Sequence, residues 1–338
     1  MKIRPWRTLP LRTRLRREAW VNGRARAGQP SVEDFASRAT VSDQVSQWIR
    51  LSTFESSPHP YALLGHQVSN WVAGLLWTRD LGGVYVGGML TRNDPATLAL
   101  SDGSDRRTGR AVRLGAVRDE RDASSLPILL DAVASAVERQ RGPLHFVFSL
   151  DQLRFDQTPA AGALREAALT GSSAAEIIRL EAASPFIALH MRRGELNREL
   201  HGDRWVLPEW YLRVITQLRE IDLVSDWPVK VFTQGEAPAQ ELRDVLGDVA
   251  EVIGSGTRES DFAHMMAAAL LVPAPSSFSF SAALASRGAV VARHPWWHAT
   301  PDEGRFAQVT HEGLLDVARV RRALDYAAST RGTAGEVV

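Results

Sequence analysis

Apolar and polar positions alternate along the second half of the chain in a pattern that predicts an α/β sheet. Short apolar runs bounded by turn residues predict buried strands, and stripes of apolar residues at helical spacing predict amphipathic helices. The expected strands are 186–190, 229–233, 249–253, 270–273 and 289–293, and the expected helices are 208–221, 237–246, 260–269 (with Ser260 as N-cap) and 279–285. Strands that alternate with helices imply a parallel sheet covered on both faces, so this half is expected to be Rossmann-like.

The first half carries a weaker form of the same pattern. Residues 56–60 are expected to form a loop, and residues 91–125 to form exposed loops around one or two short strands. The expected helices are 32–49, 68–81 and 126–141, and the expected strands are 84–86 and 144–148. We therefore predict an N-terminal Rossmann-like domain, a second one for the donor, and a frayed tail, with bounds 1–183, 184–328 and 329–338.

Composition limits the classes of function. The 338 residues are 44% hydrophobic, enough for a full core in each of two domains. Net charge is only +1, but the first thirty residues hold Lys2 and eight arginines against Glu18. An arginine-rich surface explains this bias better than a nucleic-acid arm. No apolar stretch is long enough for a membrane span, and the N-terminus lacks the apolar region of a signal peptide, so a cytoplasmic protein is expected.

The strand expected at 186–190 runs into the sequence H-M-R-R-G-E at 190–195. Residues just past a parallel strand lie at its carboxyl end, where open α/β sheets bind ligands. The planar guanidinium groups of Arg192 and Arg193 match phosphate oxygens, and Gly194 permits a sharp exit turn. The stretch predicts a phosphate or diphosphate site, with a strand followed by solvated arginines as the alternative.

A second phosphate-binding feature is the sequence P-S-S-F-S-F-S at 275–281, between an expected strand and an expected helix. Serines at a helix N-terminus place hydroxyl groups beside amides that lack intrahelical acceptors, and the helix dipole favours an anion there. In a parallel sheet this end lies on the same edge as Arg192 and Arg193. Both features are therefore expected to converge on one diphosphate, whereas simple capping by serine would explain only one of them.

Other common sites are missing from the sequence. Neither a G-x-G-x-x-G fingerprint nor a P-loop follows an expected strand, and no H-E-x-x-H pair or D-x-D run suggests a divalent metal. The absence of cysteine excludes disulfides, thiolate metal sites and cysteine nucleophiles. A diphosphate held by arginine and helix amides would need no metal to neutralise its charge, so we expect neither a metal nor a cofactor.

The arginine stretch resembles the H-x-R-R-G-D motif of inverting fucosyltransferases, the superfamily of α1,2-, α1,6- and protein O-fucosyltransferases. Residues 231–233 resemble the second block of that family. Residues 260–285 resemble the third block, in which an acidic residue precedes a serine-rich phosphate loop, and Gly65-His66-Gln67 resembles the N-terminal glycine-rich loop. The resemblance covers most of residues 186–293 and a patch near 65–80.

The resemblance implies a GT-B fold, in which two Rossmann-like domains face a cleft. It implies inverting, metal-independent transfer of a sugar, with L-fucose first, from GDP-fucose or a related GDP-sugar to a sugar or small-molecule hydroxyl acceptor. Arg193, with Arg192, would hold the diphosphate. His190 and Asp261 would contact guanosine, since a carboxylate can accept from N1–H and the 2-amino group together. Backbone and hydroxyl groups of Ser277, Phe278 and Ser279 would hold the diphosphate from the other side. The remaining implied donor-site residues are Ser276, Gly65, His66 and Thr233.

The acidic loop after the arginines supplies candidates for a general base on the acceptor hydroxyl. Glu199 is the first choice, with Glu195 and Asp203 as the others, and a solvated acidic loop is the alternative. The sequence also departs from the family pattern, because Glu195 replaces the usual Asp and Gln234-Gly235 stands where acidic residues are frequent. These departures leave the identity of the sugar open.

Two other functions fit the sequence. The chain could be a GT-B enzyme that uses another nucleotide sugar in natural-product or cell-surface glycan synthesis. It could also be a non-catalytic nucleotide- or RNA-binding protein that uses its basic N-terminus. The regular α/β alternation and the absence of an interleaved basic and aromatic patch argue against RNA binding.

Overall fold

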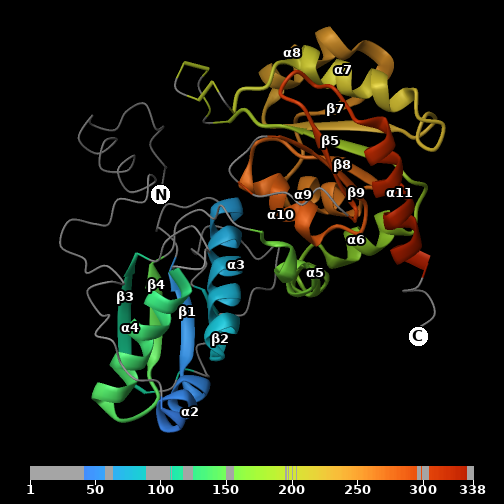
Figure 1. Cartoon of the computed structure of the whole chain (residues 1–338). Coiled ribbons are helices and arrows are strands. Elements are labelled where there is room, and N and C mark those ends of the chain that lie inside the picture. Colours follow the sequence, from blue (N-terminus) through green and yellow to red (C-terminus); the bar gives the residue numbers. More distant parts are fainter. Residues whose placement is uncertain are drawn as a thin grey trace. The chain divides into compact units, whose positions relative to one another are not determined.

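The computed structural model describes residues 42–57, 64–88, 107, 109–116, 125–149, 156–194, 196, 198–199, 201–202, 204–294, 298 and 304–332. These residues form two compact units, one up to Ala160 and one from Ala161 onward, each built on a parallel sheet (Figure 1). The α/β class with two Rossmann-like units is therefore confirmed. The basic N-terminal segment lies outside the described residues.

The first unit has a four-stranded parallel sheet with strand order β2-β1-β4-β3. Phe54 and Phe146 stack between neighbouring strands with ring centroids 5.1 Å apart. The elements are α2 (Asp43–Leu51), β1 (Thr53–Ser57), α3 (Leu64–Leu81), β2 (Val84–Gly88), β3 (Ala111–Ala116), α4 (Ser125–Gln140), β4 (His145–Ser149) and the short 3-10 helix η4 (Thr158–Ala160).

Helix α3 begins earlier than its sequence pattern predicts. Gly65 and His66 were expected in a loop that opens a helix at 68, but both lie in the first turn of α3. Leu64 is buried and the Ser69 hydroxyl donates to the Gly65 carbonyl at 3.0 Å, so the helical surface extends back to residue 64. These two residues are therefore part of a packed helix.

Strand β1 includes the first two residues of the loop expected at 56–60, Ser56 and Ser57, and the rest of that loop lies outside the described residues. Its buried side chains are largely polar. The Glu55 carboxylate accepts from Arg107 at 2.8 Å and lies 3.1 Å from His145 Nε2, while Thr53 Oγ1 lies 3.0 Å from His145 Nδ1. Burial lowers the pKa of His145, although Glu55 acts in the opposite direction. This network satisfies polar groups that a central strand would otherwise bury unpaired.

The second unit has a six-stranded sheet with order β10-β9-β8-β5-β6-β7, and every neighbouring pair is parallel. Numbered within the unit, this is the doubly wound order 3-2-1-4-5-6 of dinucleotide-binding domains. The strands are β5 (Ile187–Met191), β6 (Val229–Thr233), β7 (Glu251–Ile253), β8 (Leu270–Val272), β9 (Ala289–Arg293) and β10 (Phe306–Val309). The helices are α5 (Ala161–Thr170), α6 (Ala174–Glu181), α7 (Pro208–Arg219), α8 (Glu236–Leu246), α9 (Arg258–Ala267), α10 (Ser277–Ala285) and α11 (Val317–Gly332), with the 3-10 helix η5 (Gly247–Val249).

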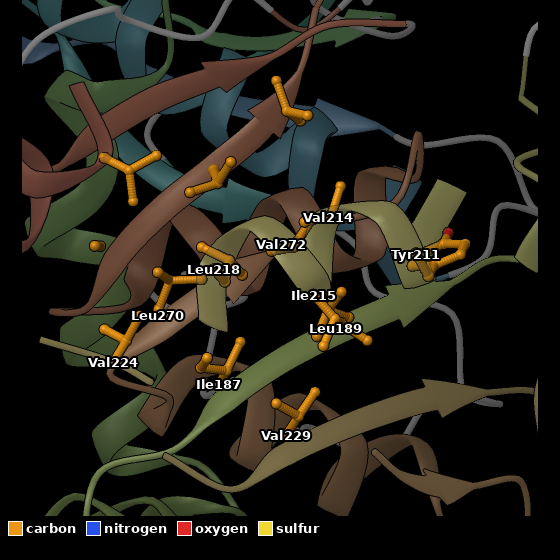
Figure 2. Close-up of a cluster of buried hydrophobic side chains, with 14 of the residues drawn as sticks. Ile187, Leu189, Tyr211, Val214, Ile215, Leu218, Val224, Val229, Leu270 and Val272 are labelled. Atoms are coloured by element: carbon orange, nitrogen blue, oxygen red, sulfur yellow. The ribbon is translucent and has the colours of Figure 1, made fainter. Parts of the chain in front are cut away.

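The main core of this unit lies between the sheet and helices α7, α8 and α11, whereas α9 and α10 cover the opposite face (Figure 1). Alternate side chains of the strands point into this core, as the pleat of a β-strand requires. Figure 2 shows Ile187 and Leu189 of β5 near Ile215 and Leu218 of α7. The continuous apolar runs that predicted the strands are the central positions of a sheet buried on both faces.

The units divide at 160/161, ahead of the boundary expected at 183/184. Helices α5 and α6 account for the difference, because α5 packs on α10 and α6 packs on α9. The Arg165 guanidinium also donates to both oxygens of Glu181, at 3.0 and 2.8 Å, and to the Ala285 carbonyl at 3.3 Å. The sequence predicts helices at 162–169 and 174–180 from their apolar spacing, but spacing does not specify the sheet that a helix covers.

Several helix boundaries in this unit differ from expectation, and three of the differences concern the start of α9, the start of α10 and the end of α11. Thr257, and not Ser260, caps α9, since its hydroxyl accepts from the Ser260 amide at 3.1 Å. Helix α10 begins at Ser277, two residues ahead of the expected start, with Ser276 in the N-cap position. Helix α11 continues to Gly332, so the first part of the tail expected to fray is helical; residues 333–338 lie outside the described range.

Arg305 joins α10 to the start of β10. Its guanidinium donates to the carbonyls of Ala283 and Leu284 at 2.8 Å each, and to Gly288 at 3.2 Å. Burial, followed by the charge of Arg165, lowers the pKa of Arg305 to about 10, so the group stays charged at neutral pH. A cation at this position satisfies the unpaired carbonyls and the negative end of the helix dipole.

Replacing Arg305 with methionine is expected to lower the free energy of unfolding by about 2–4 kcal/mol, because buried charge-assisted hydrogen bonds are lost while the apolar stem is kept. The measurement is urea unfolding. Arg319→Met is the matched control: this exposed arginine of α11 pairs with Asp316 at 3.2 Å, and it should change stability by less than about 1 kcal/mol. Equal losses in the two variants would contradict the capping role.

Candidate functional site

Two loops of the second unit leave neighbouring strands on opposite sides of a topological switch point. After β5 the chain continues to β6, and after β8 it continues to β9 on the other side. Open α/β sheets bind ligands at the carboxyl ends of the strands where the order reverses in this way. The β5 loop carries the two arginines, the β8 loop carries the serines, and Arg204 Nε donates across to the Pro275 carbonyl at 3.4 Å. The structure therefore brings the two predicted phosphate-binding features to one edge.

Arg193 follows β5 directly and is buried, with 3% of its surface exposed. Its guanidinium lies 3.3 Å from the Glu241 carboxylate of α8 and 4.0 Å from the ring centre of Trp205. Gly194 next to it has φ +53°, a left-handed conformation that confirms the expected exit turn. The arginine is thus held rigidly at the sheet edge by a carboxylate and an aromatic face that the motif itself did not indicate.

Arg192 and His190 form the neighbouring part of the site. Arg192 is half-buried, and His190 is buried with its ring 6.0 Å from the ring of Phe278. Burial first, and the charge of Arg192 second, lower the pKa of His190 to about 3, so this imidazole is neutral at working pH. Its Nδ1 atom has no hydrogen-bond partner among the described residues. An unpaired buried nitrogen is costly, and a ligand with a polar group would satisfy it.

The serine loop forms the N-terminal turn of α10. The amides of Ser277, Phe278 and Ser279 have no intrahelical acceptor, since the first such bond runs from the Phe280 amide to the Ser276 carbonyl at 3.0 Å. Ser279 is fully buried, and its hydroxyl donates to the carbonyls of Ala274 and Ser276, at 3.3 Å each. Ser279 can therefore offer its amide to an anion, while its hydroxyl supports the turn.

Asp261 lies in the first turn of α9 with its carboxylate against Gly256, where an added Cβ would come within 2.2 Å of Oδ1. Burial raises the pKa of Asp261 to about 7, and the charges of Glu176 and Glu259 act in the same direction. The group therefore titrates near neutral pH. A carboxyl poised in this way, at the edge that carries the arginines, is a candidate for hydrogen bonding to a base.

The other predicted residues occupy different places. Thr233 ends β6 next to β5, is buried, and has a hydroxyl without a hydrogen-bond partner in the described part of the chain. Glu199 is exposed in the loop after β5, and Glu195 lies outside the described residues. Gly65 and His66 belong to the first unit, in the first turn of α3.

Sequence reasoning missed several residues that complete this edge. Trp205 and Glu241 enclose Arg193, and His298 bonds to Ser277 at 3.0 Å. None of them lies in a motif, and only the fold brings them to the loops that they contact. A carboxylate on the helix after β6, as Glu241 is, would have been the best available signal for a partner of an arginine after β5.

No group of three or more His, Cys, Asp or Glu residues that could hold a metal ion occurs among the residues for which coordinates are described. Over the same part of the chain, none of the helices combines the length and apolar character needed to cross a bilayer.

Comparison with solved structures finds a likeness of fold to nucleotide-binding transferases. POFUT1 in complex with GDP matches with a TM-score of 0.46 and 11% identity, over 72% of this chain and 99% of that one. POFUT1 in complex with GDP-fucose matches with a TM-score of 0.44 and 11% identity, over 77% and 98%. E. coli heptosyltransferase WaaC with ADP matches with a TM-score of 0.40 and 10% identity, over 83% and 99%. These neighbours are GT-B glycosyltransferases. No family model and no curated protein matches the sequence.

Proposed function

We propose that the chain is an inverting, metal-independent glycosyltransferase that transfers a sugar, with L-fucose as the first candidate, from a GDP-sugar to a hydroxyl acceptor. The observation that carries this proposal is that the loops after β5 and β8, which carry the two predicted phosphate-binding features, lie together at the switch point of the second sheet. Arg192 and Arg193 lie on one side, and the amides at the start of α10, which lack an intrahelical acceptor, lie on the other.

The chemistry follows from where charge develops. As the sugar–phosphate bond breaks, its electron pair passes to the leaving diphosphate, and an acceptor oxygen attacks the opposite face of the sugar. Fixed arginine charges and helix amides at the diphosphate stabilise the transition state more than the ground state. Glu199 is the proposed base for the acceptor proton, because it lies exposed in the loop after the arginines.

Guanine is the proposed base of the donor. The Asp261 carboxylate, once ionised, can accept from N1–H and the 2-amino group together, a pair of donors that adenine and uracil do not present. The unpaired Nδ1 of His190 and hydroxyl of Thr233 would meet other polar groups of the donor. Fucose is supported by the resemblance of residues 190–195 to the fucosyltransferase motif.

A nucleotide panel tests the donor. GDP at about 100 times its dissociation constant is expected to stabilise the chain by about 2.7 kcal/mol, or about 5–10 °C in Tm for a domain of this size. UDP, dTDP and ADP at the same concentration should give smaller shifts. A larger shift with another nucleoside diphosphate would replace guanosine in the proposal. No response to any of the four would overturn it, and salt-sensitive binding of single-stranded RNA would then favour a non-catalytic RNA-binding protein.

Metal independence has its own test. Release of GDP from GDP-fucose is expected to continue unchanged after dialysis against EDTA, because the arginines and amides supply the positive potential. The measurement is the rate of GDP release before and after chelation. A loss of more than tenfold that Mg²⁺ or Mn²⁺ restores would contradict this part of the proposal and leave the transferase assignment standing.

A further inference from the structure

A buried serine–histidine pair lies at the N-terminus of α10. Ser277 Oγ is 3.0 Å from Nε2 of His298, and His298 is 1% exposed. The imidazole stacks face to face on Phe280, with ring centroids 4.6 Å apart and planes 2° apart. His298 follows β9, so a residue from the next strand's loop is fixed against the first residue of this helix.

The neighbouring serine hydroxyls are committed elsewhere. The Ser279 hydroxyl donates to the Ala274 and Ser276 carbonyls, and the Ser281 hydroxyl donates to the Ser277 carbonyl at 2.7 Å. Ser276 makes no capping bond with its side chain. Ser277 is thus the serine of this turn whose hydroxyl direction is set by another side chain.

The direction of the Ser277–His298 bond decides what Ser277 can do. If Ser277 donates to an unprotonated Nε2, its only hydrogen is used and it offers lone pairs, which repel a phosphate oxygen. If Nε2–H donates to Ser277 Oγ, the hydroxyl hydrogen is free for an acceptor. The amides of this helical turn lack an intrahelical acceptor, and the Nδ1 of His190 beside Phe278 has no hydrogen-bond partner among the described residues. Both features favour an anionic ligand as the acceptor.

We propose that His298 is a positioning residue that donates Nε2–H to Ser277, so that the Ser277 hydroxyl donates to the terminal phosphate of the bound diphosphate. This inference rests on the proposed function. Hydrogen bonds in such a chain polarise one another, so the Ser277 donor is strengthened as negative charge builds on the leaving phosphate. No proton is transferred: the sugar–phosphate electron pair passes to the diphosphate, and His298 keeps its hydrogen.

The test measures dissociation constants for GDP, GMP and guanosine by calorimetry in the full chain. Ser277→Ala and His298→Phe should each weaken the binding of GDP about ten- to hundredfold and leave the affinity for guanosine unchanged. Phenylalanine at position 298 keeps a ring against Phe280. Because both remove one relay, the double variant should bind GDP about as weakly as either single one. His298→Gln retains an N–H donor and should recover part of the loss. Ser281→Ala is the matched control and should bind GDP normally.

The outcomes separate the two proposals. If wild type binds none of the four nucleoside diphosphates, the proposed function fails; if it prefers another of the four, that nucleotide and its nucleoside replace GDP and guanosine in the series. If wild type binds but Ser277→Ala and His298→Phe lose affinity independently, the relay is wrong. If His298→Phe weakens the binding of guanosine as much as the binding of GDP, the role of His298 is purely structural. Should His298→Phe fail to fold, Ser277→Ala and His298→Gln still decide the matter, since normal GDP binding in Ser277→Ala would overturn the relay.

Discussion

Arg193→Ala is expected to abolish donor turnover, with a fall of at least about 10²–10³-fold in the rate of GDP release from GDP-fucose. The guanidinium would be lost from the place where negative charge develops. The fold should survive, with a free energy of unfolding lower by about 2–3 kcal/mol, because Glu241 loses its partner and Trp205 loses a cation on its face. Single-turnover kinetics and urea unfolding on the same preparation measure the two effects.

Glu241→Gln is the matched control for Arg193→Ala. It removes the charge that pairs with Arg193, yet its amide oxygen can still accept from the guanidinium. Because the Glu241 side chain is 41% exposed, the stability loss should be below about 1 kcal/mol, and affinity for GDP should be unchanged or higher. Near-normal turnover in Arg193→Ala would reject the assignment. Equal loss of activity in both variants would trace the effect to packing of the β5 loop.

The parts of the fold that the sequence predicts are those whose pattern is local. Strands β6 and β9 match the expected bounds, since apolar residues in a doubly covered sheet form continuous runs between turn signals. Strand β1 was missed because the sequence T-F-E-S-S has a polar pattern. Its burial depends on Glu55 and Thr53 meeting His145, a residue about ninety positions away, and no local periodicity contains that information.

The candidate site divides in the same way. Arg192, Arg193 and the serines were predictable because strand ends and helix starts imply a common edge in a parallel sheet. The residues that contact them, Glu241 and His298, were not predictable, since they are placed by the packing of α8 and by the loop after β9. The detailed roles also depend on hydrogen bonds: Ser279 was expected to use its hydroxyl on phosphate, but in the structure that hydroxyl donates to backbone carbonyls.

Asp261→Asn is expected to weaken the binding of GDP and to stabilise the ligand-free chain. Since its pKa in the folded chain is raised to about 7 from 3.8, folding favours the protonated form. The raised pKa therefore destabilises the wild type progressively as pH rises from about 4 to about 7, and the full effect persists above pH 7. Relative to wild type, the stability of Asp261→Asn should increase over that window and be higher by about 1–3 kcal/mol at pH 7.5, since solvent screens part of the effect at this half-buried group.

Binding to the wild type should change with pH in the opposite sense to stability. Only the ionised carboxylate accepts from both guanine donors, so the dissociation constant for GDP should increase about tenfold from pH 8 to pH 6, while Asp261→Asn should bind weakly and almost independently of pH. Calorimetry with GDP and ADP at pH 6, 7 and 8 measures this, and Asp244→Asn, at an exposed aspartate of α8, is the matched control. A wild-type affinity for GDP that is flat across this range, or an Asp261→Asn variant that is less stable at pH 7.5, would remove Asp261 from the base site. If Asp261→Asn increases stability and weakens the binding of GDP, the ionised carboxylate of Asp261 destabilises the fold and serves to bind the ligand.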